Sequence, residues 1–265
     1  MQKLATKIVD KPWGRRGIDP RFGIDPDRQV GEIWFEPPPG RELDVMAKYL
    51  FTTERLSIQV HPDDNMARQR GYPRGKDECW IVLDVADDAE LGIGTVRSVA
   101  PAELMAAAKD GSIVGLLDWK RPKKGDFIYN PAGTIHALGP GLTVMEIQQA
   151  VDLTYRLFDY GRPRELHLDE AAAVVRPEPH SNPLDTHVNG GSKLLVDGPH
   201  FGVAWCVGEP PELPHQMRDV QLLPVDAPVG LVQPGECALI EEGAARTLRG
   251  SGTFVLAWSA TDGEG

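Results

Sequence analysis

Short runs of alternating apolar and polar residues, separated by prolines and glycines, are the feature of this sequence that most limits its fold. The 265 residues include 23 prolines and 28 glycines, which divide the chain into many segments of strand length. Frequent turns between short strands are typical of β-sandwiches and β-barrels. Residues Pro101–Lys109 are an exception, because a proline at the start, an early glutamate and four alanines predict a helix. Ile113–Trp119 is predicted as a second short helix, Leu142–Gln149 as a strand, and residues 1–28 as a turn-rich segment. The sequence therefore predicts a mainly β protein with a short helical insertion.

A short internal repeat indicates two β-barrels of the same kind. The sequences that begin at Gly125 and Gly235 share a Gly–acid–apolar opening, and at the same offset His136 aligns with Arg246. A chance similarity between two glycine-bounded hairpins is the alternative interpretation. A stretch rich in Pro, His and Asn lies between the two copies and is typical of a linker. We therefore predict a metal-binding domain at residues 1–175, a linker at 176–192 and a second, metal-free domain at 193–265.

Composition limits the classes of function. The net charge of −11 argues against a general nucleic-acid binder, which needs a basic face. No apolar run has the length of a signal peptide or of a membrane helix, so we expect neither secretion nor a membrane partner. Cys79, Cys206 and Cys237 are widely spaced and form no CxxC pair, as expected for reduced thiols of a cytoplasmic protein.

The stretch Leu56–Asp64 (LSIQVHPDD) contains the first two candidate metal ligands. Ile58 and Val60 alternate with Gln59 and His61, which predicts a strand with one apolar and one polar face. Gln59 and His61 should therefore point the same way. A solvent-facing polar pair on a half-buried strand is the alternative.

Two further candidate ligands lie on other predicted strands. Glu78 begins the strand Glu78–Leu83, and His136 follows the turn Pro-Ala-Gly. Side chains on adjacent strands of a barrel can point inward together, and His, Gln and carboxylate groups suit a divalent ion such as Zn²⁺. The four residues thus predict a metal site, and Lys76 should lie on the same side as Glu78. His136 taken alone is better explained as a hydrogen-bonded core histidine, so the prediction depends on the four residues together.

A second candidate stretch runs from Met145 to Arg162. Glu146 and Gln148 share one face of a predicted strand, and Arg156 follows among aromatic residues. A partly buried arginine needs an anionic partner. The residues by themselves favour an internal partner, Asp152 or Asp159, and leave a substrate phosphate or a developing oxyanion as the alternative.

These motifs together resemble one known family. IQVHPDD, the KxE of Lys76–Glu78, PAGTIHAL and EIQQAVDLTYRLFDYGR are similar to motifs of the type I mannose-6-phosphate isomerases (phosphomannose isomerases of the cupin superfamily), and occur in the family's order. The KPWG and GEIW segments near the start also resemble that family. The similarity covers about residues 11–170, and the chain's length resembles the short bacterial branch. The C-terminal half shows no matching motif.

The resemblance implies a fold of two cupin (jelly-roll) barrels and a zinc ion, although other divalent metals suit similar donors. By residue-to-residue correspondence it implies these roles: metal ligands Gln59, His61, Glu78 and His136; catalytic residues Arg156, Lys76 and Glu146; substrate-binding residues Ser57, Lys76 and Arg156. Which of Lys76 and Arg156 holds the phosphate stays open, as does the proton-transfer base.

The implied activity is the interconversion of mannose 6-phosphate and fructose 6-phosphate through an enediol(ate). A metal can polarise the sugar carbonyl, and positive groups can stabilise the developing oxyanion. The expected partner is therefore a small phosphosugar, bound by a cytoplasmic monomer or homodimer. Two alternatives are an isomerase or epimerase of another phosphosugar, and a sugar-binding cupin without catalytic activity.

Overall fold

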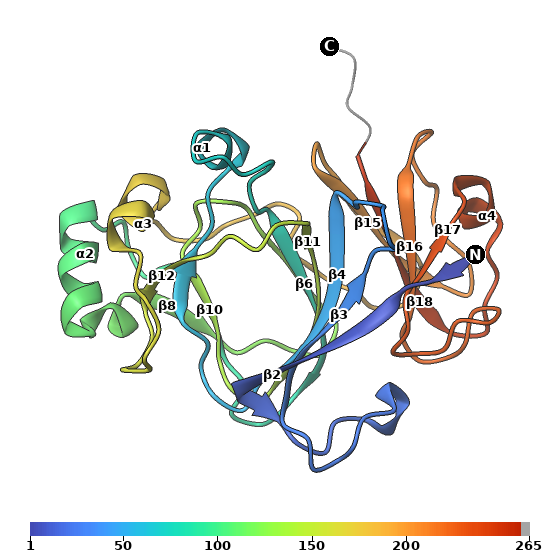
Figure 1. The fold of residues 1–265 in the computed structure, drawn as a ribbon, viewed down its shortest axis with the longest axis horizontal. Coiled ribbons are helices and arrows are strands. Elements are labelled where there is room, and N and C mark those ends of the chain that lie inside the picture. Colours follow the sequence, from blue (N-terminus) through green and yellow to red (C-terminus); the bar gives the residue numbers. More distant parts are fainter. Residues whose placement is uncertain (261–265) are drawn as a thin grey trace. The chain divides into compact units, whose positions relative to one another are not determined.

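The computed structural model describes residues 1–260 and confirms a mainly β protein (Figure 1). The chain divides into two compact units. The terminal unit contains residues 1–50, 145–148 and the described chain from Thr186 onward, and the central unit contains residues 51–144 and 149–185. The first fifty residues thus group with the C-terminal segment, whereas the boundaries predicted from the sequence place them with residues 51–175.

The central unit holds most of the predicted site residues. Its elements are β5 (Ile58–Val60), α1 (Asp64–Arg68), β6 (Glu78–Val85), β7 (Leu91–Thr95), α2 (Pro101–Asp110), the 3₁₀ turn η2 (Ser112–Gly115), β8 (Leu117–Lys120), β9 (Asp126–Asn130), β10 (His136–Leu138), β12 (Tyr155–Phe158) and α3 (Leu168–Val174). Five of the strands form a sheet in the order β12-β5-β10-β7-β8. β6 pairs with β9 in an antiparallel ladder. The strand β11 (Leu142–Gln149) has residues in both units.

One face of the five-stranded sheet packs on helices, so its other face is available for polar side chains. Ile58 and Val60 are fully buried in a core shared with residues of α2 and α3, and Figure 1 shows these helices beside β12 and β5. The alternation of β5 then turns Gln59 to the opposite face.

The predicted helix is present as α2. Pro101 occupies its first turn, and Gly111 ends the helix with a φ of 84°. The segment Ile113–Trp119, which the sequence predicted as another short helix, forms only η2 and then the strand β8.

The terminal unit consists almost entirely of strands. Its elements are β1 (Gln2–Lys3), β2 (Ala5–Arg15), the 3₁₀ turn η1 (Pro20–Phe22), β3 (Val30–Glu36), most of β4 (Val45–Phe51), β13 (Thr186–His187), β14 (Lys193–Asp197), β15 (Phe201–Val207), β16 (Arg218–Pro224), β17 (Ala238–Ile240), α4 (Glu242–Thr247) and β18 (Thr253–Ser259). Six strands form a sheet in the order β1-β17-β16-β18-β15-β14. This sheet contributes to a separate core that includes Leu222, Phe254 and Trp258.

The strand β2 corrects the prediction of a turn-rich segment at residues 1–28. β2 tolerates Pro12 because the ladder is irregular there: Asp10 and Arg15 both pair with Val30, so the intervening residues bulge out. A proline in such a bulge breaks no hydrogen bond of the ladder. The composition of the segment does not reveal the bulge.

Gly14 lies in this bulge, and replacing it by alanine is expected to lower the free energy of unfolding. A Cβ at Gly14 would lie 2.5 Å from the carbonyl carbon of Val30, so the backbone must shift. We expect a loss of about 1–3 kcal/mol, measured by urea unfolding. In the control Gly243→Ala, on α4, the new Cβ meets nothing within 4 Å. Alanine's helix propensity should then stabilise the protein by up to about 1 kcal/mol. A Gly14→Ala variant as stable as the parent would contradict this account.

The predicted second hairpin of the internal repeat is not formed. Ala238–Ile240 is the strand β17, but Arg246 lies in helix α4, where it pairs with Glu242 at 2.6 Å. The sequence Gly-Ala-Ala-Arg favours a helical turn over a strand, because alanine is the strongest helix former. The likeness to the segment around His136 is therefore a similarity of sequence only.

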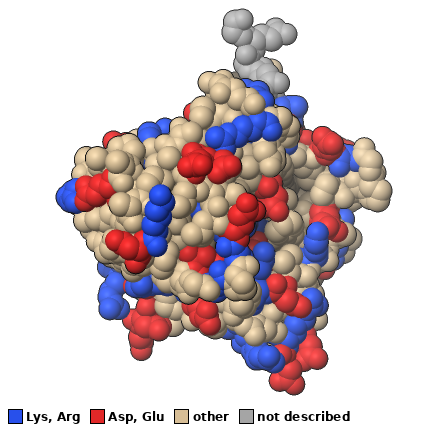
Figure 2. Space-filling view, turned by 60° about the vertical axis from the view of Figure 1, so that its left-hand side comes forward, with Lys and Arg blue, Asp and Glu red and all other residues tan. Residues whose placement is uncertain are grey.

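The described residues contain no helix with the length and apolarity needed to cross a membrane. On the face drawn in Figure 2, acidic and basic side chains are intermixed.

Candidate metal centre and active site

A row of polar residues crosses three neighbouring strands of the central unit. In the ladder register, Gln59 of β5 stands opposite His136 of β10 on one side and opposite Arg156 of β12 on the other. Directly paired residues project to the same face of a sheet. The three side chains therefore share the face that does not pack on α2 and α3.

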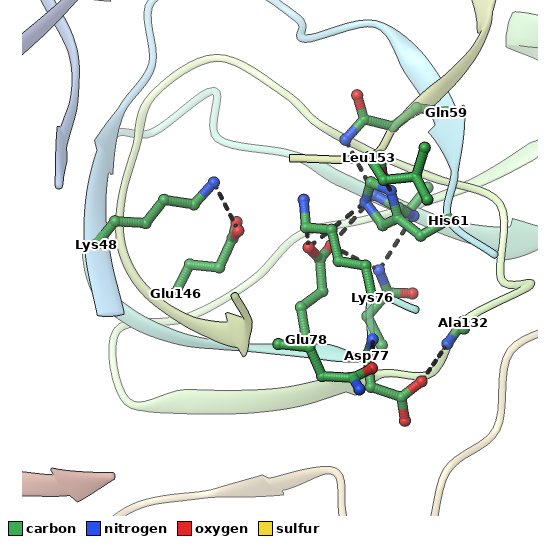
Figure 3. A network of polar contacts seen from close by, with 12 residues as sticks. Lys48, Gln59, His61, Lys76, Asp77, Glu78, Ala132, Glu146 and Leu153 are labelled. Atoms are coloured by element: carbon green, nitrogen blue, oxygen red, sulfur yellow. Dashed lines mark hydrogen bonds and ion pairs between the residues drawn. The ribbon is translucent and has the colours of Figure 1, made fainter. Parts of the chain in front are cut away.

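His61, Glu78 and His136, all buried, come together in the central unit. Figure 3 shows His61 and Glu78 of this cluster pointing toward each other. Their donor atoms all lie within 4.8 Å of one another, and each residue is about 1% exposed. Glu78 lies between the two rings, with Oε2 3.5 Å from Nε2 of His61 and Oε1 3.3 Å from Nε2 of His136. This cluster could hold a metal ion.

Backbone carbonyls orient both imidazole rings toward Glu78. Nδ1 of His61 lies 2.9 Å from the carbonyl oxygen of Leu153, and Nδ1 of His136 lies 2.9 Å from that of Thr134. Because a carbonyl oxygen only accepts, these contacts assign the proton to Nδ1 and a lone pair to Nε2 in both rings, although the amide nitrogen of Asn130 also lies 3.1 Å from Nδ1 of His136. In addition, Nε2 of His61 is buried and has no hydrogen-bond partner among the described residues. A buried lone pair of this kind fits metal ligation.

The electrostatics also favour a metal-binding protonation state. Burial lowers the pKa of His61 to about 3, helped by the charge of Lys76, and burial lowers the pKa of His136 as well. Burial by itself raises the pKa of Glu78, but Lys76 and the two histidines outweigh it, so the pKa falls well below its ordinary value. Near neutral pH the cluster is two neutral imidazoles and one carboxylate, as a divalent cation requires.

Gln59, the fourth predicted ligand, lies beside this cluster. Its Nε2 is 3.2 Å from Nε2 of His136, and its Oε1 accepts a hydrogen bond of 3.0 Å from the hydroxyl of Ser57. A half-turn of the amide would exchange the two atoms and direct the oxygen toward the histidine. Ser57, predicted to bind substrate, is 3% exposed and contacts Gln59.

Lys76 is close to the cluster, as the sequence predicted. Its Nζ lies 3.2 Å from Oε2 of Glu78, and the residue is only 6% exposed. β6 begins at Glu78, so Lys76 reaches this position from the preceding loop rather than from a continuing strand.

Arg156 differs from the expectation of an internal partner. Asp159 instead pairs with Arg162 and Arg164, at 2.8 and 2.5 Å. Among the described residues, the Arg156 guanidinium has no hydrogen bond or ion pair. The backbone of Arg156 is bound instead: its N–H donates to Nδ1 of His167, and its carbonyl oxygen accepts from the N–H of His167. Burial lowers the pKa of Arg156, and the nearby charge of Arg164 lowers it further. The guanidinium is therefore free to bind an external anion.

A pocket of about 400 Å³ adjoins this arginine. Arg156 lines it together with Arg70, Tyr72, Asp152, His167 and Glu170, among others. The guanidinium of Arg70 lies 5.0 Å from the ring centre of Tyr155. The pocket thus combines two arginines and a histidine with two carboxylates, and the arginines are its donors for a phosphate group.

Sequence reasoning missed two residues that hold the candidate site residues in place. The amide of buried Asn130 donates a 2.8 Å hydrogen bond to Oε1 of Glu78. In the terminal unit, Lys48 lies 2.8 Å from Oε1 of Glu146 and is 7% exposed. Asn130 resembled an ordinary turn residue. For Lys48, the available signal was a lysine within the apolar strand sequence VMAKYLF.

The fold and these side chains define a mainly β protein with a candidate metal centre beside a free arginine. A scan against models of known protein families finds no match. A probable mannose-6-phosphate isomerase of Bacillus subtilis is 40% identical over 190 residues, which cover 69% of this chain and 55% of the relative. The chain thus spans about half the length of that relative. A putative mannose-6-phosphate isomerase of the same organism is 33% identical over 251 residues, or 76% of this chain and 77% of the relative.

A solved structure agrees with these relatives. The mannose 6-phosphate isomerase from Bacillus subtilis matches with a TM-score of 0.77 at 27% identity, covering 97% of this chain and 98% of that chain. The chain belongs to the family of type I mannose-6-phosphate isomerases.

Proposed function

We propose that this protein is an aldose–ketose isomerase that interconverts mannose 6-phosphate and fructose 6-phosphate. The observation that carries the proposal is the shared sheet face, on which Arg156 and His136 both pair in register with Gln59. Among the described residues, the guanidinium of Arg156 has no partner. An anion-binding group beside a metal-type donor set is what a phosphosugar isomerase requires. Family membership supports the same substrate class.

We infer that His61, Glu78, His136 and Gln59 hold a divalent metal, with Zn²⁺ as the ion of choice. Two neutral imidazoles, a carboxylate and an amide oxygen suit zinc in a site that leaves room for substrate. When bound, the metal would act as a Lewis acid that polarises the substrate carbonyl. Ser57 would then orient the Gln59 amide, in addition to the substrate contact predicted from the sequence.

The chain's own cations would divide the remaining work. The isomerisation moves a proton between C1 and C2 through an enediol(ate), so negative charge develops on the sugar oxygens. Lys76 lies at the cluster and can donate a hydrogen bond from Nζ to such an oxygen. Arg156 would hold the phosphate, because its guanidinium is free and matches phosphate geometry with paired N–H groups.

For the proton-transfer base we favour Glu146 over Lys76. The contact of Lys76 with the Glu78 carboxylate favours a role as a donor. Lys48 fixes the orientation of the Glu146 carboxylate, and a base needs a defined position as well as a suitable pKa.

We also propose that each unit is a cupin-type barrel. Two separate cores support this, one beneath the five-stranded sheet of the central unit and one beneath the six-stranded sheet of the terminal unit. A cytoplasmic location fits the three cysteines, which are buried and form no disulfide. The proposed assembly is a monomer or homodimer.

A coupled assay tests the activity. Metal-loaded protein should convert mannose 6-phosphate to fructose 6-phosphate, and a panel of other hexose phosphates should react at least about tenfold more slowly. No turnover of mannose 6-phosphate would refute the proposal. Preference for another member of the panel would reassign the substrate within the phosphosugars, and sugar binding without any turnover would indicate a binding protein.

A further inference from the structure

Asp77 lies between two proposed site residues, Lys76 and Glu78, but its own carboxylate contacts neither of them. We propose that Asp77 is a positioning residue that joins the loops carrying the metal donors and so sets the metal affinity of the central unit. The inference concerns the metal site of the proposed function and rests on it.

The carboxylate of Asp77 joins the start of β6 to the turn that precedes His136. Oδ2 accepts a hydrogen bond of 2.6 Å from the hydroxyl of Tyr129. Oδ1 accepts one of 2.9 Å from the backbone N–H of Ala132, which Figure 3 shows. Tyr129 is 8% exposed, and burial raises the pKa of its hydroxyl, with the charge of Asp77 adding to the effect. The hydroxyl therefore keeps its proton and donates.

The backbone of Asp77 extends the same connection to the end of β11. Its N–H donates to Oε1 of Gln149 at 2.9 Å, and its carbonyl oxygen accepts from the backbone N–H of Gln149 at 3.0 Å. Nε2 of Gln149 in turn donates to Oδ1 of Asp64 at 2.9 Å, and the N–H of Gly75 donates to the same oxygen at 2.8 Å. The network thus reaches the segment that follows His61.

Two backbone bonds close the arrangement around the donors. The N–H of Lys76 donates to the carbonyl oxygen of Pro62 at 3.0 Å, and the N–H of Gly133 donates to that of His61 at 2.8 Å. The segments that carry His61, Glu78 and His136 are therefore linked directly. Within these links, the Asp77 side chain bonds to both ends of the segment 129–132, at Tyr129 and at Ala132.

This placement should matter for metal binding more than for folding. A metal site works only when its donors are held within about 0.5 Å of their ideal positions. Loss of an outer partner that orients a ligand costs about 10–100-fold in metal affinity. Adjacent residues of an extended chain point to opposite sides, so the Asp77 side chain can connect the loops without occupying the metal site.

The test is a titration of the metal-free protein with Co²⁺ and with Zn²⁺. Calorimetry measures the affinity for each ion, and the absorption spectrum of bound Co²⁺ reports the geometry of the site. Asp77→Ala should bind about 10–100-fold more weakly and show an altered Co²⁺ spectrum. Tyr129→Phe, which loses one of the two bonds, should weaken binding several-fold. Asp77→Asn should remain within about threefold of the parent, because its oxygen can accept from Ala132 and its amide can donate to the tyrosine oxygen.

Asp84→Ala is the matched control. Asp84 lies exposed on the same strand β6, so its loss should leave affinity and spectrum unchanged. A merely structural role would lower the unfolding free energy of Asp77→Ala without changing the spectrum of the folded protein. If Asp77→Ala fails to fold, Tyr129→Phe still tests the inference, because its metal affinity should fall several-fold below that of the parent.

An affinity for Asp77→Ala within twofold of the parent would overturn the inference, as would failure of Asp77→Asn to restore binding. These outcomes are independent of turnover. If the parent isomerises mannose 6-phosphate but Asp77→Ala binds metal normally, the inference fails and the proposed function stands. If Asp77→Ala binds metal more weakly but the parent turns over no phosphosugar, the inference about Asp77 stands and the proposed function fails.

Discussion

Arg156→Ala is expected to lower kcat/KM for mannose 6-phosphate by about 10²–10³-fold while leaving the free energy of unfolding nearly unchanged. Both halves of this expectation follow from one observation. The guanidinium has no partner among the described residues, so removing it leaves no buried carboxylate without a counter-charge. Its interactions are therefore available to substrate. Steady-state kinetics and urea unfolding on the same samples measure the two quantities.

Arg164→Ala is the matched control for this variant. Arg164 donates two hydrogen bonds to the buried carboxylate of Asp159, at 2.5 and 2.7 Å. Its loss should cost about 1–2 kcal/mol of stability, because Arg162 still holds Asp159. Arg156→Ala should thus lower turnover, whereas Arg164→Ala should lower stability. An Arg156→Ala variant within threefold of the parent in kcat/KM would contradict the assignment.

Unphosphorylated mannose distinguishes the two possible roles of Arg156. If the guanidinium holds the phosphate, the loss in kcat/KM should largely disappear with mannose, because that contact is absent for both proteins. If it stabilises the developing oxyanion, the loss should persist with mannose. Arg156→Lys should recover only part of the activity in either case, because a lysine offers no paired donors.

His136→Ala is expected to abolish stoichiometric metal binding and to reduce isomerase activity to background. The ring contributes a neutral Nε2 to the donor set, and alanine removes both this donor and its contact with Glu78. Chelation of the parent protein should have the same effect on activity, reversed by adding Zn²⁺. At a free metal concentration of 1,000 times the Kd, the free energy of unfolding of the parent should also rise by about 4 kcal/mol. The same metal concentration should leave the unfolding of the variant unchanged.

His180→Ala provides the comparison for this loss. His180 is also a buried histidine of the central unit, but it pairs with Asp185 at 2.9 Å and does not belong to the donor cluster. Its replacement should lower stability and keep the metal. Metal analysis after gel filtration compares the metal content of the two variants. One metal per chain in His136→Ala would show that the metal site lies elsewhere.

Several features of the site could be predicted from the local sequence. The alternation around Gln59 and His61 set their common face, because strand geometry turns every second side chain the same way. The helix α2 and the strand β11 were predicted within a residue of their observed bounds, since their signals are contained in the segments themselves. The order of the motifs also identified the family before any pairing of strands was known.

Other features depended on contacts between distant segments. The freedom of Arg156 follows from the pairing of Asp159 with Arg162 and Arg164, which spacing along the chain did not reveal. The strand β2 was missed because its ladder with β3 accommodates a proline in a bulge. Arg246 was assigned to a hairpin, but its own segment prefers a helix.

By itself, the sequence identified candidate side chains for metal and anion binding, and the alternation of the strand set the common face of Gln59 and His61. The tertiary structure decided which of them meet: Glu78 between the rings of His61 and His136, Lys76 beside them, and Asp77 across the loops. The physical reason is that side-chain direction along a strand is local, whereas strand register and loop packing join residues up to tens of positions apart.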